Sequence, residues 1–544
     1  MKKIQSFLKE NVTFSKKDVT TILIILFLYG LFSFYKLGNL YSPNTFYRIE
    51  QGENIIIELN EKERISNIKY FNGEKSTNFT VYLSDDNINY DYFINTKDSG
   101  VFTWNEIEIN SFAKYIKLEI MEDTSIGELA ILDEDNNQIS YSSINEYLLD
   151  EKNLVPNNIS YMNSTYFDEV YFARTAYEYA NNIKTYEWTH PPLGKIIQAI
   201  PIFITGYFSP FLYRFMGNIA GILMLLIMYI MGAILFKKRG YAILSSLIMA
   251  FDTFHFAHTR MGTVDSHLVL FIMISVLMMI LYLKKNKTIY LGLSGLFFGL
   301  SICVKWTGFY AGLGLAILYF YDFIKNKKKI GNTLIKGTGF FIIIPLIFYC
   351  LWFLLFPNNY YYTNNLKGII KENKEMYNYH SKLEATHFFS SPWYTWPISY
   401  KPVWYHQQDL EENKEETISG VGNLFIWITG IFAFLYAIYK MILKKDKNSM
   451  FLIVLILSLW LPYILIGRIM FLYHYFPVLP FLFLLISSFM KDLQEKLKLY
   501  FIVPVFLISI ILFFITYYPV VSGTPISKNF AKDLELFDSW YFQN

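Results

Sequence analysis

Residues 211–236 read FLYRFMGNIAGILMLLIMYIMGAILF, and Lys237-Lys238-Arg239 follow them directly. An apolar run of about 20 residues is long enough to cross the hydrocarbon core of a bilayer as an α-helix. The rest of the chain repeats this pattern of apolar segments and short basic junctions, and its 544 residues are 53% hydrophobic and only 17% charged. The sequence therefore predicts a polytopic α-helical membrane protein.

We expect eleven membrane spans. They lie near 19–36, 211–236, 241–258, 264–283, 288–304, 306–323, 333–356, 420–442, 449–467, 472–490 and 499–518. The basic N-terminus and the clusters at 237–239, 284–285, 327–329, 444–445 and 491–498 fall at every second junction. By the positive-inside rule these junctions are cytoplasmic. The other junctions and the C-terminus are then extracytoplasmic in a plasma-membrane protein whose N-terminus is cytoplasmic.

Between the first two spans the pattern changes. Short alternating segments such as 54–59, 78–83 and 115–120 are separated by Asn, Asp and Gly turns, which predicts an inserted antiparallel β-sandwich or jelly roll. Two amphipathic helices at 166–183 and 191–205 are expected at the membrane surface. The regions are the N-terminus with the first span (1–40), the β-insertion (41–150), a first outer loop (151–210), a transmembrane core (211–356), a second outer loop (357–419), the C-terminal spans (420–518) and an outer tail (519–544).

Ionisable residues collect on the predicted outer face. The first outer loop holds Asp168-Glu169 and Thr189-His190-Pro191-Pro192-Leu193-Gly194-Lys195, and span ends add Arg260, Asp265, Lys305, Trp306, Arg468 and His474. All eight histidines also fall on this side. Charge at a membrane surface is costly and usually functional, so we expect one extracytoplasmic site built from several span ends.

Each of these residues also has a structural interpretation. Asp168 suits a helix N-cap and Glu169 a solvated first-turn carboxylate, while Lys195 can snorkel to the headgroups. Arg260 can pair with Asp265. The histidines at 255, 258 and 267 have a weak metal-ligand spacing and fit packed or interfacial positions better, and Trp393, Trp396, Trp404 and Tyr405 suit an interfacial belt. The arrangement, rather than any single residue, carries the prediction of a site.

Carboxylates, several cations and aromatic side chains at a lipid boundary suit group transfer from a lipid-phosphate donor. The phosphate leaving group needs cations such as Arg260, Lys305 or Arg468. A hydroxyl nucleophile needs a base, for which Asp168 is the natural candidate. One base without a general acid is the requirement of an inverting sugar transfer.

These residues also carry a resemblance. Asp168-Glu169, the His190 to Lys195 segment, Val304-Lys305-Trp306, the aromatic stretch at 391–405 and the segment from Arg468 to Phe481 resemble the dolichyl-phosphate-mannose–protein mannosyltransferase family in its bacterial form. The similarity runs in order over about 19–40 and 157–544. It implies a type C glycosyltransferase fold that moves mannose from polyprenyl-phosphate-mannose to Ser or Thr of translocated proteins.

The resemblance also implies residue roles. Asp168 and Glu169 correspond to the family's catalytic acidic pair, with Asp168 as the base, and Arg214 matches a family arginine. The remaining expected donor-phosphate and substrate residues are His190, Lys195, Arg260, Asp265, Lys305, Trp306, Arg468 and His474, and those on the acceptor side are Trp393, Trp396 and Trp404. The β-insertion lies outside the family pattern and is similar to a discoidin or galactose-binding module, which would hold glycan or acceptor; a spacer is the alternative.

Other interpretations stay open at this point. The acceptor could be a lipid or cell-wall glycan, as in the related aminoarabinose transferases, or the chain could be a non-catalytic glycan-binding membrane protein. The expected partners are the polyprenyl-phosphate-mannose donor, a protein acceptor, the bilayer and the secretion translocon, with no nucleic acid. We assign no metal ligands, and the sequence does not decide whether a divalent cation such as Mg²⁺ or Mn²⁺ takes part.

Overall fold

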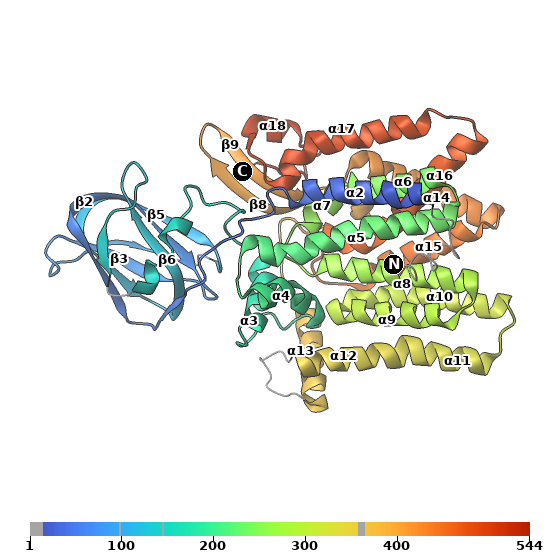
Figure 1. Cartoon of the computed structure of the whole chain (residues 1–544), viewed down its shortest axis with the longest axis horizontal. Coiled ribbons are helices and arrows are strands. Elements are labelled where there is room, and N and C mark those ends of the chain that lie inside the picture. The colour runs from blue at the N-terminus through green and yellow to red at the C-terminus, as the bar shows by residue number, and fades with distance from the viewer. Residues whose placement is uncertain (1–14, 97–99, 144–145, 357–364, 544) are drawn as a thin grey trace. The chain divides into compact units, whose positions relative to one another are not determined.

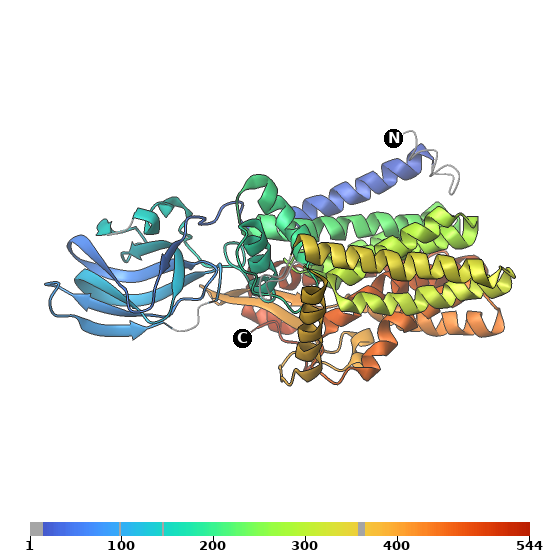
Figure 2. The ribbon, with the colours of Figure 1, turned by 90° about the horizontal axis from the view of Figure 1, so that it is seen from below.

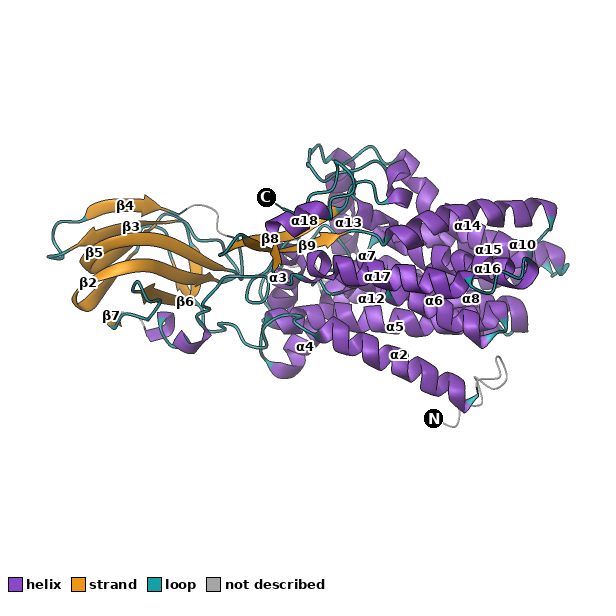
Figure 3. Cartoon of the chain, turned by 90° about the horizontal axis from the view of Figure 1, so that it is seen from above, coloured by secondary structure: helices purple, strands orange, loops and turns teal. Residues whose placement is uncertain are grey.

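The computed structural model describes residues 15–96, 100–143, 146–356 and 365–543. The chain divides into two compact units. A helical unit is drawn from the ranges 1–35, 182–198 and 215–544, and a β-containing unit from 36–181 and 199–214. Most elements are labelled in Figure 1, and Figure 3 colours them by type, so that the strands β2 to β7 stand out from the helices.

Long apolar helices dominate the chain. They are α2 Lys16–Phe34, α5 Pro210–Phe236, α8 Asp265–Lys285, α9 Thr288–Val304, α10 Phe309–Lys325, α11 Ile330–Thr338 continued by η4 Gly339–Ile343 and α12 Ile344–Leu355, α14 Leu424–Leu443, α15 Lys447–Trp460, α16 Leu479–Lys496 and α17 Ile502–Ser522. Short turns η3 Trp306–Gly308, η6 Leu461–Leu465 and η7 Leu472–Val478 adjoin α10, α15 and α16. The prediction of a polytopic helical membrane protein is confirmed.

The number of helices that could span a membrane can be compared with the eleven spans that we expected. Within the described residues, nine helices are long and apolar enough to cross a membrane, and the pair α6 Arg239–Ala250 and α7 Thr253–Thr259 makes ten if it counts as one span. This pair bends by 60°, where we expected one span over 241–258. The apolar helix α9 is shorter. Our count of eleven therefore stays a prediction.

Polar side chains stabilise the backbone where α6 and α7 break. Asp252 caps α7 by accepting a hydrogen bond from the His255 N–H at 3.0 Å. The Asn423 amide donates to the Phe251 carbonyl at 2.9 Å. Backbone groups freed by a break at membrane depth need such partners because no water is available there.

Small residues let α9 approach η4 and α12 closely. A Cβ added at Gly295 would lie 2.1 Å from the Phe340 carbonyl oxygen, and one at Gly299 would lie 2.8 Å from the Pro345 Cα. The two glycines form a GxxxG pattern, which allows close backbone approach in membrane helix pairs.

Residues 365–423 precede the last four long helices. They form α13 Leu366–Lys382, η5 Trp393–Ile398 and a hairpin of β8 Val403–Leu410 and β9 Lys414–Gly420, with β10 Ile526–Ser527 paired to β9 and followed by α18 Lys528–Asp533. Figures 1 and 2 show α13 at a steep angle to α12. Ile369 and Met376 of α13 pack against Phe353 of α12, so α13 is anchored to the helical unit.

The β-containing unit holds one antiparallel sheet. Its strands are β1 Tyr47–Ile49, β2 Asn54–Asn72, β3 Phe79–Ser84, β4 Asp91–Asn95, β5 Trp104–Ile120, β6 Thr124–Leu132 and β7 Tyr141–Ser143, in the order β1-β6-β2-β5-β3-β4 with β7 beside β2. The two longest strands, β2 and β5, pair over most of their length, with register shifts after Glu58 and Ile65. Short turns η1 Glu146–Leu148 and η2 Lys152–Leu154, α3 Glu169–Ala180 and part of α4 Leu193–Thr205 complete this unit.

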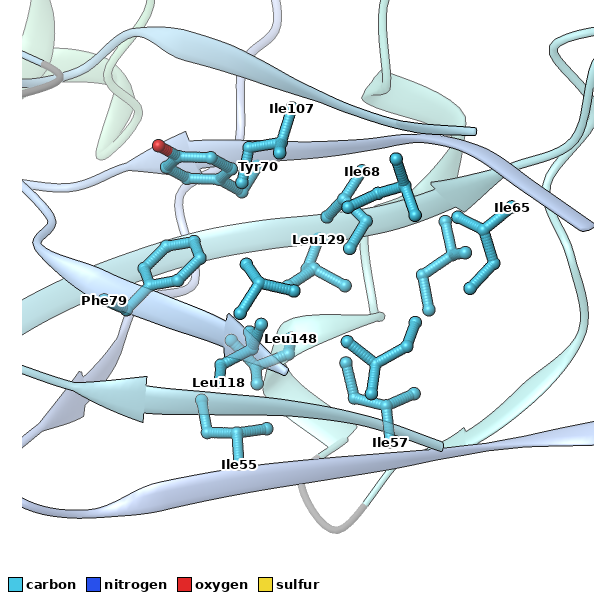
Figure 4. Close-up of a cluster of buried hydrophobic side chains, with 14 of the residues drawn as sticks. Ile55, Ile57, Ile65, Ile68, Tyr70, Phe79, Ile107, Leu118, Leu129 and Leu148 are labelled. Atoms are coloured by element: carbon cyan, nitrogen blue, oxygen red, sulfur yellow. The ribbon is translucent and has the colours of Figure 1, made fainter. Parts of the chain in front are cut away.

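Two apolar clusters stabilise this unit. The larger one gathers alternate side chains of the strands, among them Ile57, Ile68, Phe79 and Leu118, as Figure 4 shows. In the other, Trp104 and Phe102 pack with Ala173 and Ala176 of α3. The expected β-rich insertion is present, and its strands are hydrogen-bonded into one sheet. Its arrangement as a sandwich or jelly roll and its likeness to a discoidin module stay predictions.

Candidate active site

A cavity of about 1190 Å³ lies in the helical unit. Its lining comes from the 189–191 loop, the junction of α9 and α10, η4 with α12, α13, and residues 465–468. The apolar part of the lining includes Phe341, Ile342 and Leu346. Lys305 and Arg468 supply positive charge. Glu384 adds one carboxylate. A lining that combines apolar side chains with two cations and one acid suits an amphiphilic anion.

Lys305 lies where α9 ends. Its Nζ donates to the Asp265 Oδ1 at 2.9 Å. Asp265 begins α8, so this ion pair joins two neighbouring helix ends. An ammonium group has three donors, and the Asp265 bond uses one of them in the part of the chain that the structure describes. Lys305 therefore keeps donors for a ligand.

Arg468 is held by a histidine of α13. Its Nη1 lies 2.8 Å from the His380 Nδ1, and the His380 Nε2 lies 2.8 Å from the Thr189 carbonyl oxygen. Arginine can only donate and a carbonyl can only accept, so Nδ1 is the acceptor and Nε2 carries the proton. His380 is therefore neutral in this arrangement. Burial lowers the pKa of His380 to about 4, which agrees with a neutral ring.

A buried acid organises the loop that carries His190. Glu187 accepts hydrogen bonds from the Thr189 N–H at 2.8 Å and from Lys195 at 2.7 Å, and it lies 3.0 Å from the His190 Nδ1. Burial by itself would raise the pKa of Glu187, but the charges and hydrogen bonds of Lys195 and His190 together outweigh it and hold that pKa below its usual value. Burial lowers the pKa of His190.

Lys195 proves to be a structural residue. Its side chain is fully buried, and its Nζ donates to the Glu187 carboxylate and to the backbone carbonyls of Glu187 and His190. These three bonds use all three donors of the ammonium group. The prediction that Lys195 binds donor phosphate, and the alternative that it snorkels to headgroups, are both wrong for this reason.

The acidic pair lies in the β-containing unit. Glu169 is fully buried and accepts two bonds of 2.7 Å from Arg214, which also donates to the carbonyls of Leu37, Tyr161 and Ser164. These contacts occupy all five N–H donors of the guanidinium. We therefore assign Arg214 and Glu169 a structural role, contrary to our expectation of a phosphate ligand and a catalytic or solvated carboxylate.

Asp168 differs from its neighbour. It occupies the N-cap position of α3, is half-buried, and makes no capping hydrogen bond through its side chain. Its carboxylate is therefore not the helix cap that the sequence allowed. That Asp168 acts as the catalytic base stays a prediction.

Arg260 binds backbone carbonyls. It donates to those of Ser33 and Tyr35, at the end of α2, at 3.1 and 2.8 Å, and to that of Ser522, at the end of α17. Cations are favoured at helix C-termini because the last carbonyls lack partners. The cavity lining within the described residues contains Lys305, Trp306, His190 and Arg468 but leaves out Arg260. A structural role at the helix ends therefore replaces the expected phosphate contact.

The predicted aromatic site residues include one that lines the cavity and one that is buried away from solvent. Trp306 lines the cavity and donates to the Tyr349 hydroxyl at 2.9 Å. Trp396 is fully buried and stacks on His474 with ring centroids 6.0 Å apart, so Trp396 does not offer the substrate-facing surface that we predicted. The role expected for His474 stays a prediction. Trp393 and Trp404 are half-buried. Whether they contact an acceptor stays a prediction.

Several residues of this site escaped the sequence reasoning. Glu187 lies two residues before the Thr-His-Pro-Pro segment, and its spacing from His190 and Lys195 was the available signal. His380 and the Asn373–Tyr349 hydrogen bond of 2.6 Å link α13 to the cavity, and nothing local in the sequence marks them. No group of three or more His, Cys, Asp or Glu side chains that could hold a metal ion occurs among the residues that the structure describes.

Comparison with known proteins identifies the class. The fold is similar to the S. cerevisiae protein O-mannosyltransferase Pmt1–Pmt2 complex bound to the sugar donor, with a TM-score of 0.60 at 14% identity over 69% of this chain and 89% of that one. This likeness confirms a type C glycosyltransferase fold for this polytopic membrane protein.

Sequence comparison narrows the class to a family. Residues 189–354 match the family model of dolichyl-phosphate-mannose-protein mannosyltransferase, and residues 365–540 match that of the C-terminal four-helix transmembrane region of protein O-mannosyltransferase. The chain belongs to the protein O-mannosyltransferase family. Polyprenol-phosphate-mannose–protein mannosyltransferases of Mycolicibacterium smegmatis and Mycobacterium tuberculosis are 22% and 23% identical, over 66% and 69% of this chain and 85% and 86% of theirs. Both family models begin after the β-insertion and after Asp168.

Proposed function

We propose that this enzyme transfers mannose from polyprenyl-phosphate-mannose to Ser or Thr hydroxyls of proteins, with inversion, at the extracytoplasmic face of the plasma membrane. The observation that carries the proposal is the cavity in which Lys305 and Arg468 keep unused donors beside an apolar lining. The polyprenyl chain would contact the apolar side chains. The phosphate would bind the two cations.

The chemistry needs one base and a stabilised leaving group. The Asp168 carboxylate takes the proton of the acceptor hydroxyl while the hydroxyl oxygen attacks the anomeric carbon of mannose. The bond from that carbon to the phosphate oxygen breaks, and its electron pair stays on polyprenyl phosphate. Lys305 and Arg468 stabilise the charge that develops on the phosphate. The acceptor gains mannose and Asp168 holds the proton, which leaves to water.

The orientation rests on charge distribution. Lysine-rich junctions alternate with the polar ones that carry His190, Lys305 and Arg468, and lysine-rich junctions favour the cytoplasm. Labelling with a membrane-impermeant thiol reagent tests this assignment, with single cysteines introduced at Tyr394 and at Lys328 after Cys303 and Cys350 are replaced by Ala. Labelling of Y394C in intact cells supports it, whereas labelling of K328C alone reverses it.

The direct test of function is transfer in a purified system. The protein is incubated with polyprenyl-phosphate-[³H]mannose and a Ser/Thr-rich peptide, beside the Asp168→Asn variant. Radioactive peptide with wild type and not with the variant supports the proposal, and NMR of the product reports whether the anomeric configuration inverts. If the label appears only on lipids or glycans of the membranes, the acceptor is one of these and not a protein.

A further inference from the structure

The helix α13 crosses the end of a helix that is long and apolar enough to span a membrane. Its Ile369 and Met376 pack against Phe353, near the end of α12, and Figures 1 and 2 show the two helices at a steep angle. The stretch Ile330–Leu355, which ends with α12, has only 11% of its most apolar window buried within the protein. The rest of its surface therefore faces lipid, and α13 lies at the level where this span ends.

One exposed face of α13 is apolar. Leu366, Ile370 and Tyr377 are 63%, 69% and 64% exposed, and their spacing of four and seven residues places them on one side of the helix. Tyr377 lines the cavity together with the exposed side chains of Ile342 and Leu346. Because these two belong to η4 and α12, the apolar strip of Leu366, Ile370 and Tyr377 continues the lipid-facing surface of the span.

A lysine stripe borders the apolar strip. The fully exposed charged residues of α13 are all lysines, namely Lys367, Lys371, Lys374 and Lys382. Their spacing of four, three and eight residues places them on one side of the helix. With 3.6 residues per turn, this side is roughly opposite to the one that Ile369 and Met376 bury. The acids Glu372 and Glu375 are buried and half-buried, so the surface that α13 turns away from the protein is cationic.

An apolar strip beside a row of cations suits the boundary of a bilayer. A basic amphipathic helix lies in this boundary with its apolar side chains against the acyl chains and its polar side among the head groups. Lysine side chains are long enough to keep the ammonium group at head-group level while the stem lies along apolar surface. Anionic head groups supply the complementary charge. An acidic soluble protein would match the lysine stripe but not an apolar strip that continues a lipid-facing surface.

We propose that α13 lies in the membrane interface and binds the head groups of anionic phospholipids through its lysine stripe. The apolar strip enters the acyl boundary beside the cavity. This inference does not depend on the proposed reaction, because it uses only the exposed side of α13.

The buried side of α13 connects the lipid surface to the cavity. His380 lies 2.8 Å from Arg468, and Asn373 accepts a hydrogen bond of 2.6 Å from the Tyr349 hydroxyl. All four of these residues line the cavity. A bilayer that fixes α13 therefore also fixes one wall of the cavity.

Local quenching by lipid tests the proposal in the full-length protein. Cys303 and Cys350 are replaced by Ala, and an environment-sensitive fluorophore is attached to Ile370→Cys. The protein is reconstituted in bilayers of phosphatidylcholine and phosphatidylglycerol, and each lipid is brominated in turn at the same mole fraction. We expect both to quench the fluorophore, and the anionic phosphatidylglycerol to do so more strongly. Ile88→Cys is the matched control, because Ile88 is an exposed isoleucine (81%) between β3 and β4 of the β-insertion and should not be quenched.

The lysine stripe is tested by substituting its members. One lysine near an anionic surface favours anionic lipid roughly fivefold, so Lys367→Gln/Lys374→Gln/Lys382→Gln should bring the ratio of quenching by the two lipids close to one. Quenching by brominated phosphatidylcholine should remain. A control with the same charge change replaces exposed lysines outside α13, Lys62, Lys75 and Lys532, by Gln. This control should keep the parent ratio.

Each contrary result overturns the proposal. If neither lipid quenches the fluorophore at Ile370, or if Ile88 is quenched equally, the apolar strip is not specifically inserted in the bilayer. Equal quenching by both lipids in the parent protein, or a preference for phosphatidylglycerol that survives the loss of the three α13 lysines, would exclude the lysine stripe as the head-group site. Loss of the preference in the control variant would show that net charge, rather than α13, is responsible. Thermal unfolding of every variant should match that of the parent, since all the substituted lysines are exposed.

Discussion

Two acid–cation pairs of this protein are built from the same kinds of group and have different properties. Glu169–Arg214 in the β-containing unit and Asp265–Lys305 in the helical unit are both direct ion pairs, at 2.7 and 2.9 Å. Every donor of Arg214 is used by protein atoms, whereas Lys305 spends one donor on protein atoms of the described residues. The first pair stabilises structure. The second is available for a ligand, so the number of unused donors distinguishes a site residue from a scaffold residue.

The largest expected effect is on the rate of transfer, and it distinguishes Asp168 from the adjacent Glu169 in the β-containing unit. Asp168→Asn should lower the turnover of mannose transfer by about 10²- to 10⁴-fold, because the acceptor hydroxyl loses its base. The substitution keeps the size and shape of the side chain, so the variant should remain folded. The measurement is single-turnover transfer to peptide alongside the melting temperature. A variant that keeps most of its activity would exclude Asp168 as the base.

The next effect concerns stability. Arg214→Met leaves the Glu169 carboxylate buried without its partner, which should cost about 3–5 kcal/mol of unfolding free energy. Limited proteolysis and thermal unfolding in detergent measure the loss. The double variant Arg214→Met/Glu169→Leu, which removes both charges, should recover much of it. If the Arg214→Met protein is stable and binds the donor more weakly, the result would instead support the prediction that Arg214 binds the donor phosphate.

Lys305→Met should act on the donor. Losing one charge-assisted hydrogen bond costs about 1.5–3 kcal/mol, which corresponds to roughly a ten- to hundredfold weaker affinity for polyprenyl phosphate. Lys195→Met is the comparison, because Lys195 has no donor left for a ligand and should lower stability before it changes affinity. If both variants lose the same affinity, the number of unused hydrogen-bond donors does not distinguish Lys305 from Lys195 as a phosphate ligand.

The smallest effect is a pH dependence. His380 must be neutral to accept from Arg468, and its pKa falls from 6.5 to about 4 in the folded protein. Since the unfolded state binds the proton more readily, the contribution of this contact is full above about pH 6.5 and declines as the pH falls toward 4. Donor affinity depends on the protonation state of the folded protein, so in the wild type it should fall only as the pH approaches the folded-state pKa of about 4. His380→Phe should lack this fall.

Glu372 of α13 also titrates in this range, because burial raises its pKa to about 7. The quantity to compare is therefore the difference between the pH profiles of donor affinity for the wild type and for His380→Phe. His380→Asn, which keeps an acceptor for Arg468, serves as the conservative variant and should retain more affinity than His380→Phe. Superimposable wild-type and His380→Phe profiles would show that Arg468 does not depend on this histidine.

Much of the architecture could be predicted from the sequence. Apolar length marks most of the spans, and the alternating pattern at 46–140 marks the β-insertion, because both signals are local and periodic. The 60° break at Asp252 was missed, since the capping groups that permit it include Asn423, far along the chain. Asp168, Lys305 and Arg468 keep the roles expected for them as proposals. Glu169, Arg214, Lys195, Arg260 and Trp396 do not.

The amino-acid sequence by itself determined that this chain is a polytopic membrane protein with a β-insertion, and its motifs pointed to the mannosyltransferase family. Only the tertiary structure decided which charged side chains are available to a substrate. Arg214 is saturated by carbonyls at 37, 161 and 164 together with Glu169, and Arg468 is positioned by a histidine 88 residues away. Hydrogen-bond capacity is consumed by neighbours in space, and the order of residues along a chain does not record them.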